Sequence, residues 1–298
     1  MRLLITGAHG QVGWELQRTL QTLGDVVACD RGDLDLANPN SIRVRISDVQ
    51  PGVIINAGAY TAVDKAEAEP KLAMAVNGVA PGVLAEEAKR LAALLVHYST
   101  DYVFDGTKPG AYFESDEPNP ASVYGSSKLA GEQAVSAVGG TYLIFRTSWV
   151  YGSRGKNFLR TILRLASERE ELRVVDDQFG APTWCRTIAE ATAQVIAKLS
   201  QGGRVDTERA LTLGGTYNLT AGGGVSWCEF ARAIVETTRS RRSGAGPKVT
   251  PITTAEYPLP ARRPANSVLS NEKFQRAFGL ACPAWDRALD LCLAELAA

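Results

Sequence analysis

Short apolar segments alternate with helical ones along the first half of this 298-residue chain, and this alternation most constrains its fold. The apolar segments read as buried strands, which we expect at Arg2–Thr6, Asp25–Cys29, Val53–Asn56, Leu94–His97 and Tyr142–Arg146. Strands that are apolar on both faces and separated by helices are typical of a parallel sheet covered on both sides. The sequence therefore predicts an α/β fold built on a doubly wound parallel sheet.

A glycine-rich turn follows the first predicted strand. Gly7, Gly10 and Gly13 lie in the segment GAHGQVG, which runs directly into the helical pattern WELQRTLQTL. A strand, a glycine turn and a helix start together present backbone N–H groups that can hold a pyrophosphate. The spacing G-x-x-G-x-x-G differs in the middle from the usual dinucleotide fingerprint, and three glycines also make ordinary tight turns. The strand and helix around it favour a Rossmann-type dinucleotide turn.

The end of the second predicted strand bears on the choice of cofactor. Asp30 lies 17 residues after Gly13, close to where an acidic residue meets the adenine ribose. Arg31 follows at once and could instead meet a 2′-phosphate, so we expect both NADPH and NADH to serve. A solvated strand end is the alternative interpretation of this pair. After the third strand, residues 57–60 are small apart from a tyrosine and would let a cofactor approach the backbone.

Groups suited to proton transfer follow the fourth predicted strand. Thr100 and Asp101 come at its end, and Tyr124 and Lys128 lie four apart in a helical segment, on one face. A cation beside a phenol favours the phenolate, which would make Tyr124 a better acid–base group near neutral pH. The hydroxyl of Thr100 could hold a carbonyl oxygen against that tyrosine. These groups together predict proton transfer at an oxygen while a hydride moves at the attached carbon. A tyrosine and a lysine four residues apart also occur by chance on exposed helices.

Composition excludes several function classes. Lys plus Arg equals Asp plus Glu at 32 each, so zero formal charge gives no electrostatic footprint for nucleic acid or an anionic membrane. Five scattered cysteines without a C-x-x-C pair predict reduced thiols in a cytoplasmic protein, without a disulfide framework or a zinc site. No segment approaches the ~20 apolar residues that span a bilayer, and the apolar run in MRLLITG is too brief for a signal peptide.

Few other residues suggest chemistry. His97 lies within an apolar strand and is expected in the core, whereas His9 lies in the glycine turn and more readily borders a cofactor than ligates a metal. Asn77 is expected on a helix surface, from which it could support the active site. The motifs G-x-S-x-G and H-E-x-x-H and the P-loop are absent from the sequence, so hydrolysis by a triad, zinc proteolysis and Walker-type phosphoryl transfer lack their parts.

The second half of the chain is less regular. We expect a helix at Phe158–Glu168, a strand at Leu172–Val175, a helix from about Arg186 to Leu199 and a late strand at Tyr217–Thr220. The helix that begins at about Arg186 is expected to return to the sheet. Residues 1–152 plus about 186–222 should therefore form the dinucleotide-binding domain. Residues of about 153–185 plus 223–298 should form a smaller C-terminal α/β domain that binds substrate.

With these residues in view, the chain resembles the extended short-chain dehydrogenase/reductase superfamily along nearly its whole length. Within it, the chain is most similar to the reductases that complete dTDP-L-rhamnose synthesis. The motifs that carry the resemblance are GQVGWEL (10–16), TAVDKAE (61–67), YSTDYVFDG (98–106), YGSSKLAGE (124–132), RTSWVYG (146–152), FGAPT (179–183) and RRPANS (262–267).

The resemblance implies an activity and a set of site residues. The activity is NADPH- or NADH-dependent reduction of the C4 keto group of dTDP-4-dehydrorhamnose to dTDP-L-rhamnose. The superfamily's catalytic triad maps to Thr100, Tyr124 and Lys128, and contacts with the nucleotide sugar map to Thr100, Asp101, Trp149, Asn157 and Arg263. The implied cofactor-binding residues are Gly7, Gly10, Gln11, Val12, Gly13, Asp30, Arg31, Asp35, Leu36, Ala57, Gly58, Ala59, Tyr60, Tyr124 and Lys128.

Two other functions and one question of assembly stay open. The chain could be another extended reductase or epimerase of a nucleotide sugar, or a non-catalytic homologue like the regulatory subunit of methionine adenosyltransferase. Some bacterial relatives join subunits through a magnesium ion held by glutamates, which correspond to Glu15, Arg186 and Glu295 here. Because a guanidinium cannot become a metal ligand, we expect Arg186 to pair with Glu15 or Glu295 directly. We therefore expect no structural magnesium, and a monomer or a metal-independent homodimer.

Overall fold

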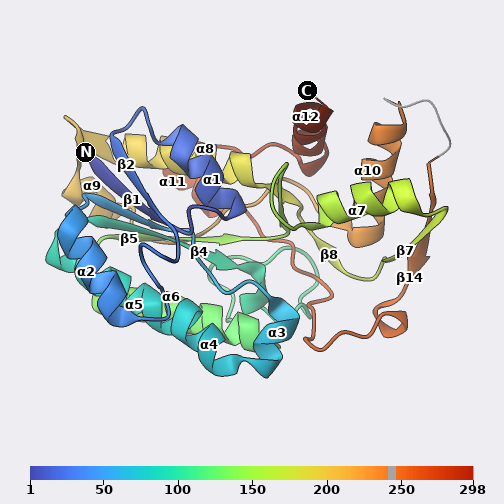
Figure 1. The fold of residues 1–298 in the computed structure, drawn as a ribbon, viewed down its shortest axis with the longest axis horizontal. Helices are drawn as coiled ribbons and strands as arrows, with labels where there is room; N and C mark the ends of the chain where they lie inside the picture. Colours follow the sequence, from blue (N-terminus) through green and yellow to red (C-terminus); the bar gives the residue numbers. More distant parts are fainter. Residues whose placement is uncertain (241–245, 298) are drawn as a thin grey trace.

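The computed structural model describes residues 1–240 and 246–297, and a six-stranded parallel sheet lies at its centre (Figure 1). The strands follow the order β12-β5-β4-β3-β1-β2, and each pairs in parallel with its neighbours. Their bounds are β1 (Arg2–Thr6), β2 (Asp25–Cys29), β3 (Val53–Asn56), β4 (Leu94–Thr100), β5 (Tyr142–Thr147) and β12 (Gly215–Asn218). The predicted doubly wound parallel sheet is confirmed.

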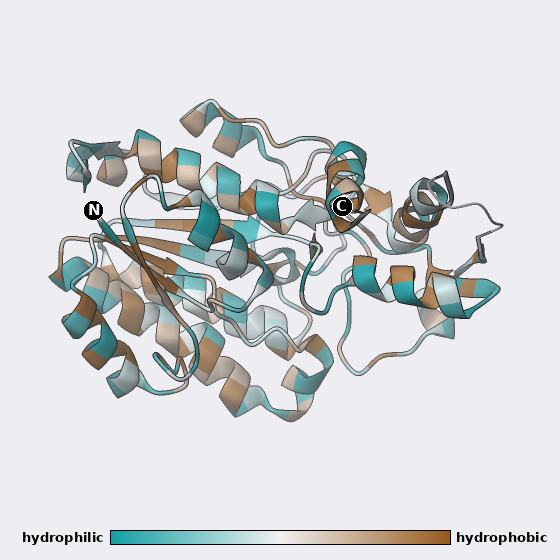
Figure 2. Ribbon diagram, turned by 45° about the horizontal axis from the view of Figure 1, so that its top comes forward, coloured by the Kyte–Doolittle hydropathy of each residue, from teal (hydrophilic) through white to brown (hydrophobic). Residues whose placement is uncertain are grey.

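Helices cover both faces of the sheet. On one face lie α1 (Gln11–Thr19), α8 (Cys185–Lys198), α9 (Thr207–Thr212) and α11 (Glu272–Phe278); on the other lie α2 (Pro39–Val49), α5 (Ala80–Arg90) and α6 (Val123–Val138) (Figure 1). Successive residues of β1 point to opposite faces, so that Leu3 and Ile5 pack under α1 whereas Leu4 packs against α2. The central strands β3, β4 and β5 accordingly contain continuous apolar runs (Figure 2).

A second group of elements extends from the carboxyl edge of the sheet. It contains α7 (Phe158–Glu168), α10 (Trp227–Ser240), α12 (Trp285–Ala297), and the parallel pair β7 (Glu171–Val175) and β14 (Lys248–Ile252). Their apolar side chains form a separate core around Phe230 and Leu159, which are fully buried. Short strand pairs, β6 (Val150–Tyr151) with β9 (Thr183–Trp184) and β8 (Phe179–Gly180) with β13 (Val225–Ser226), connect this group to the sheet.

Several segments differ from the sequence prediction. The helical segment that contains Asn77 is interrupted, because α4 (Pro70–Met74) passes into a π-helical turn, η1 (Ala75–Val79), before α5. The late strand begins at Gly215, two residues before the predicted start, and ends at Asn218. The helix α3 (Val63–Ala68), the strand β14 and the hairpin β10 (Ser200–Gln201) with β11 (Arg204–Val205) were not predicted. β14 contains Pro251, which lowers the strand signal but is tolerated in a two-stranded edge.

Two findings bear on the environment of the chain. All five cysteines are free thiols, and Cys282 alone among them is not fully buried. Within the described residues, none of the helices has the length and apolar character required to cross a membrane.

Candidate active site

The proton-transfer residues meet at the carboxyl edge of the sheet, as predicted. β4 ends at Thr100, and Asp101 opens the short 3-10 turn η2 (Asp101–Val103). The first turn of α6 is fixed by the Ser122 hydroxyl, which accepts from Gly125 N and caps the helix. Tyr124 and Lys128 therefore stand one turn apart on the side of α6 that faces β4. Both are close to the end of that strand.

Lys128 is fully buried and bonded to the protein. Its Nζ donates to the backbone oxygen of Tyr98, 2.5 Å away, and burial lowers its pKa to about 8 against the opposing charge of Glu132. His97, beside it in β4, is 1% exposed, which confirms its predicted place in the core. Burial, followed by the charge of Lys128, holds the pKa of His97 well below its ordinary value, so the imidazole is neutral.

The expected effect of Lys128 on Tyr124 is wrong in this structure. Burial of the phenol raises its pKa to about 12, and the neighbouring Thr100 hydroxyl opposes that rise only partly. The ammonium group of Lys128 points to the Tyr98 carbonyl instead. The low polarity around the phenol therefore outweighs the nearby cation, and Tyr124 is held in its protonated form. The edge of its ring also packs on Tyr102, with ring centroids 5.6 Å apart.

Asp101 is buried beside this pair. One of its carboxyl oxygens accepts from the Thr100 hydroxyl at 2.8 Å, and the other has no hydrogen-bond partner among the described residues. Burial raises the pKa of Asp101 to about 6, and the neighbouring hydroxyl groups of Ser267 and Thr100 oppose that rise. Only 2% of the residue is exposed, and this burial makes the carboxyl group easier to protonate than one in water.

The glycine turn is closed tightly by its own packing. Gly7 has φ +68°, and a Cβ there would come within 2.7 Å of Gly58, in the segment after β3. A Cβ at Gly13 would lie 2.2 Å from the backbone oxygen of Gly7. Gly10 caps α1 without a side-chain hydrogen bond, so the first N–H groups of the helix meet no capping side chain. A turn of this shape leaves room for a phosphate at the helix start.

The residues predicted to reach the adenine ribose lie at the end of β2. Asp30 Oδ1 accepts from Gly32 N at 2.7 Å, which is the main reason that its pKa is lowered, and Oδ2 lies 3.3 Å from His9 Nε2. Arg31 is largely exposed and pairs with Asp35 over 3.7 Å. Leu36 packs against Gly58, and Val12 borders both apolar cores near α1. Asp30 and Arg31 therefore both lie beside the glycine turn.

Asn77 was expected on a helix surface, but it is buried. It lies in the π-helical turn, where its side-chain oxygen accepts from Tyr60 N at 2.8 Å and its amide donates to Tyr60 O at 3.0 Å. The amide also donates to Ser127 Oγ at 3.1 Å, in α6. Asn77 thus fixes the small-residue segment Ala57-Gly58-Ala59-Tyr60 relative to the helix that carries Tyr124.

Trp149 takes an unusual backbone conformation after β5. Its φ is +47°, a left-handed conformation that costs free energy for a bulky residue other than glycine. The indole stacks on Trp227 of α10, with centroids 3.4 Å apart and planes 5° from parallel. Gly180 makes room for this ring, because a Cβ there would lie 2.4 Å from it. The predicted contact residue therefore lies where the sheet meets the second group of elements.

A cavity of about 380 Å³ opens in that second group, between α7, β7 and the segment before Arg263. Aromatic side chains and guanidinium groups line it, including Phe158, Trp227, Tyr257, Arg169, Arg173 and Arg263. Arg263 also makes a two-pronged ion pair with Asp64 of α3, at 2.9 and 2.8 Å. Asp64 is a site residue that the sequence prediction missed, although the TAVDKAE motif contains it.

Asn157 makes several structural contacts in this chain. Its side-chain oxygen caps α7 by accepting from Arg160 N at 3.0 Å, and its amide donates to Gln11 Oε1 at 2.7 Å. The same amide reaches the backbone oxygens of Gly152 and Arg154. Because protein groups occupy the amide, Asn157 connects the glycine turn to α7, and its role toward a substrate stays a prediction.

Arg186 bonds both glutamates with which it was expected to pair. Its Nε lies 3.1 Å from Glu15 Oε2, and Nη1 lies 2.9 Å from Glu295 Oε2. The predicted contact is therefore confirmed. In the described part of the chain, no cluster of three or more His, Cys, Asp or Glu side chains could hold a metal ion.

Comparisons with known proteins agree on one family. The family model described as "RmlD substrate binding domain" matches residues 1–298. The dTDP-4-dehydrorhamnose reductase of Burkholderia thailandensis is 52% identical over 99% of both chains, and that of Escherichia coli K12 is 43% identical over 99% of this chain and 98% of the relative.

Solved structures agree as well. A dTDP-4-dehydrorhamnose reductase from Clostridium acetobutylicum is 38% identical, covers all of both chains and superposes with a TM-score of 0.91. The Bacillus anthracis enzyme in complex with NADP is 36% identical over 99% of both chains, with a TM-score of 0.89. A UDP-glucose 4-epimerase of Thermus thermophilus shares the fold with 20% identity and a TM-score of 0.80. The chain belongs to the dTDP-4-dehydrorhamnose reductase family.

Proposed function

We propose that this protein reduces the C4 keto group of dTDP-4-dehydrorhamnose to dTDP-L-rhamnose with NADPH or NADH. The observation that carries the proposal is the meeting of Thr100, Tyr124 and Lys128 at the carboxyl edge of the sheet, the edge at which the glycine turn also follows β1. Full-length relatives at up to 52% identity bear the name of this reductase, and one solved relative holds NADP.

The cofactor has a suitable cradle in this chain. The close approach of Gly7 and Gly58 and the helix start at Gly10, free of a capping side chain, form a concave backbone surface for a pyrophosphate. Asp30 accepts hydrogen bonds and suits a ribose hydroxyl, whereas the exposed guanidinium of Arg31 suits a phosphate. When bound, the nicotinamide supplies the hydride.

The chain's own residues handle the proton. Tyr124, kept protonated by burial, donates its phenolic proton to the oxygen that develops charge at C4. The Thr100 hydroxyl, which lies beside the phenol, helps to hold that oxygen. Lys128 holds the nicotinamide ribose, and it gives up its bond to the Tyr98 carbonyl or shares it to do so. The product is a secondary alcohol, and one proton is consumed for each hydride transferred.

We place the nucleotide of the substrate in the cavity beside Arg263. Its aromatic side chains can stack on a base, and its guanidinium groups can pair with a diphosphate. Trp227 lines this cavity, and the indole of Trp149 stacks on it. The two separate apolar cores, one under the sheet and one around Phe230, support the two domains expected from the sequence. The exception is α11, which packs on the sheet core. The five free cysteines favour a cytoplasmic setting.

An assay with purified protein tests the proposal. We expect NADPH and NADH to be oxidised only when dTDP-4-dehydrorhamnose is present, with dTDP-L-rhamnose identified as the product by NMR. The same 4-keto sugar attached to UDP serves as the matched control and should react poorly. Cofactor binding without oxidation would favour the regulatory alternative. Faster reaction of the UDP sugar would instead favour a reductase of another nucleotide sugar.

A further inference from the structure

The carboxylate of Asp64 accepts three hydrogen bonds from one short stretch of the chain. Arg263 Nη1 donates to Oδ1 at 2.9 Å, Nη2 donates to Oδ2 at 2.8 Å, and the backbone N–H of Ala261 donates to Oδ1 at 3.2 Å. Asp64 lies in α3, which follows β3 of the sheet, whereas Ala261 and Arg263 follow β14 in the second group of elements. The carboxylate therefore joins the two groups.

The contact with Asp64 leaves part of the Arg263 guanidinium group unused. A guanidinium has five N–H donors in one plane. The two on Nη1 bond Asp64 and the backbone oxygen of Ala261, and one on Nη2 bonds Asp64. The remaining two, on Nε and Nη2, lie along another edge of the group and have no hydrogen-bond partner among the described residues. Such an edge can bond two oxygens of one phosphate.

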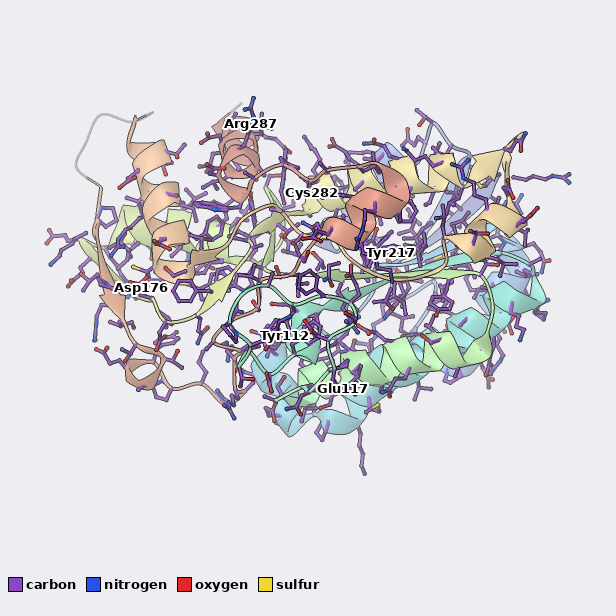
Figure 3. The ribbon with its side chains drawn as sticks, turned by 180° about the vertical axis from the view of Figure 1, so that it is seen from behind. Tyr112, Glu117, Asp176, Tyr217, Cys282 and Arg287 are labelled. Carbon is purple, nitrogen blue, oxygen red and sulfur yellow. The ribbon has the colours of Figure 1, made fainter. Side chains whose placement is uncertain are left out.

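Residues 257–263, here called the bridging segment, form part of the wall of the cavity. They follow η3 (Thr254–Glu256) and run from the end of β14 to α3, as Figure 1 and Figure 3 show from opposite sides. Within this segment, the side chains of Tyr257 and Arg263 line the cavity. Arg263 therefore reaches the cavity at the place where the bridging segment meets Asp64.

Two polar contacts fix the bridging segment, one at each end. Just before it, Thr254 N lies 2.9 Å from both carboxylate oxygens of Asp177, and the Thr254 hydroxyl donates to Oδ1 at 2.6 Å. At its other end is the contact with Asp64. Residues 257–260 between these contacts are exposed, so packing against a core does little to place them. The orientation of Arg263 therefore depends largely on Asp64.

A second arginine of the cavity lacks such an anchor. Arg173 Nη2 lies 2.8 Å from Glu256 Oε1, but both of these side chains are about half exposed, whereas the Arg263 side chain is 19% exposed. Exposed ion pairs hold their side chains only weakly, and a two-pronged pair that is partly removed from water fixes them better. Arg263 is therefore the better ordered of the two.

We propose that Asp64 positions Arg263 to bind the diphosphate of the nucleotide sugar. The inference rests on the proposed function, which places the nucleotide in this cavity. Asp64 occupies one edge of the guanidinium group and leaves the second edge for phosphate oxygens. A side chain that is already ordered loses little freedom when the ligand binds. The phosphate bonds the guanidinium directly and lies farther from the carboxylate, so the gain from positioning outweighs the repulsion between the two anions.

The first test is Asp64→Asn, which keeps the size of the side chain but leaves one oxygen to accept from Arg263. We expect the KM for dTDP-4-dehydrorhamnose to rise roughly tenfold, the size expected for one lost charge-assisted hydrogen bond. The kcat should stay within about threefold, because an interaction with the diphosphate is the same before and during the reaction. Calorimetry with dTDP alone should show the same tenfold loss of affinity. Thymidine, which lacks the diphosphate, should bind both proteins equally in an NMR titration.

A double-mutant cycle distinguishes the positioning of Arg263 from a general structural role. Arg263→Ala should weaken dTDP binding by roughly tenfold or more, again the scale of a charge-assisted bond. Adding Asp64→Asn to that variant should change the affinity by less than about twofold, because no guanidinium remains to be positioned. Arg263→Gln serves in the cycle if the alanine variant does not fold. The matched control is Glu86→Gln, which makes the same change in net charge at an exposed ion pair with Arg43 and should leave dTDP affinity unchanged.

Three results would overturn the inference. Unchanged dTDP affinity in Asp64→Asn would show that Arg263 needs no anchor, and tighter binding would show that the carboxylate mainly repels the phosphates. An equal loss of affinity with and without Arg263 would show that Asp64 acts through the fold alone. Failure of the proposed function would appear separately, as a wild-type protein that binds dTDP with this dependence on Asp64 but oxidises no NADPH with the 4-keto sugar.

Discussion

Burial decides the protonation of the residues that handle the proton. It raises the pKa of Tyr124 to about 12 and that of Asp101 to about 6, and it lowers the pKa of Lys128 to about 8. These shifts favour the neutral form of each group, as expected where water is excluded. A phenol that stays protonated suits the direction of reduction, because the reaction needs an acid at the start of each turnover.

Substitution of Tyr124 by Phe should remove the transferable proton while keeping the ring. The ring's edge contact with Tyr102 does not depend on the hydroxyl, so the fold should be preserved. We expect kcat to fall roughly 10²-fold or more, the scale of general-acid catalysis, with cofactor affinity largely retained. Steady-state kinetics together with a fluorescence titration of NADPH would measure both. Near-normal turnover would remove Tyr124 from the mechanism.

Cofactor choice should depend on the pair at the end of β2. Asp30 repels a 2′-phosphate and accepts from a 2′-hydroxyl, whereas exposed Arg31 attracts the phosphate, so wild-type protein should use both NADH and NADPH. Asp30→Ala should shift the ratio of kcat/KM values towards NADPH. A wild-type preference above about a thousandfold, ~4 kcal/mol, would mean that one of the two side chains does not reach the cofactor.

At the scale of elements, the glycine turn depends on backbone packing against β3. Gly13 permits the first turn of α1 to lie against Gly7, and Gly7 in turn lies against Gly58. A side chain at any of these positions would push the helix start away from the sheet. The shape of the phosphate cradle therefore comes from three close backbone approaches rather than from polar side chains.

Gly13→Ala should disrupt this turn. The added Cβ would lie 2.2 Å from Gly7 O, a contact that only a shift of the backbone relieves. We expect the protein to lose about 1–3 kcal/mol of stability, the usual range for overpacking, and to bind NADPH at least about tenfold more weakly. Gly52→Ala is the matched control, because its Cβ would meet only ordinary contacts, at 3.8 Å or more. Unchanged NADPH affinity in Gly13→Ala, measured by calorimetry, would contradict the assigned cradle.

The sequence predicted those elements whose formation depends on residues close to one another in the chain. Five strands of the sheet and α7 are where apolar runs and helical periodicity place them, and Thr100, Tyr124 and Lys128 follow from them. The π-helical turn could not be predicted, because it depends on bonds from Asn77 to Tyr60 and Ser127, 17 and 50 residues away. The raised pKa of Tyr124 could likewise not be predicted, because burial is a property of the folded chain.

At the scale of the whole molecule, long-range contacts join the sheet to the second group of elements. Arg263 bonds Asp64 across 199 residues, Asn157 bonds Gln11 across 146, and Arg186 joins α1 to α12 through Glu15 and Glu295. These contacts surround the site without any of them touching Tyr124. They explain why the motifs of the sequence are spread along the chain, while the site that they form is compact.

The contact at Arg186 leads to a prediction about assembly. Glu15 is buried, and the guanidinium group supplies the positive charge that balances it and Glu295. Magnesium prefers several oxygen ligands and would have to compete here with a cation that cannot lose its proton. We therefore expect the sedimentation coefficient to be the same with EDTA and with excess magnesium, whether the protein is a monomer or a dimer.

Arg186→Glu is the variant that sharpens this test. It replaces the cation by a third carboxylate next to Glu15 and Glu295, which should repel one another unless a divalent ion binds. We expect the variant to be less stable than wild type in EDTA and to recover stability when magnesium is added, whereas the wild-type melting temperature should not respond to either. Wild-type dimers that dissociate on chelation and re-form with magnesium would show that Arg186 does not take the place of the metal.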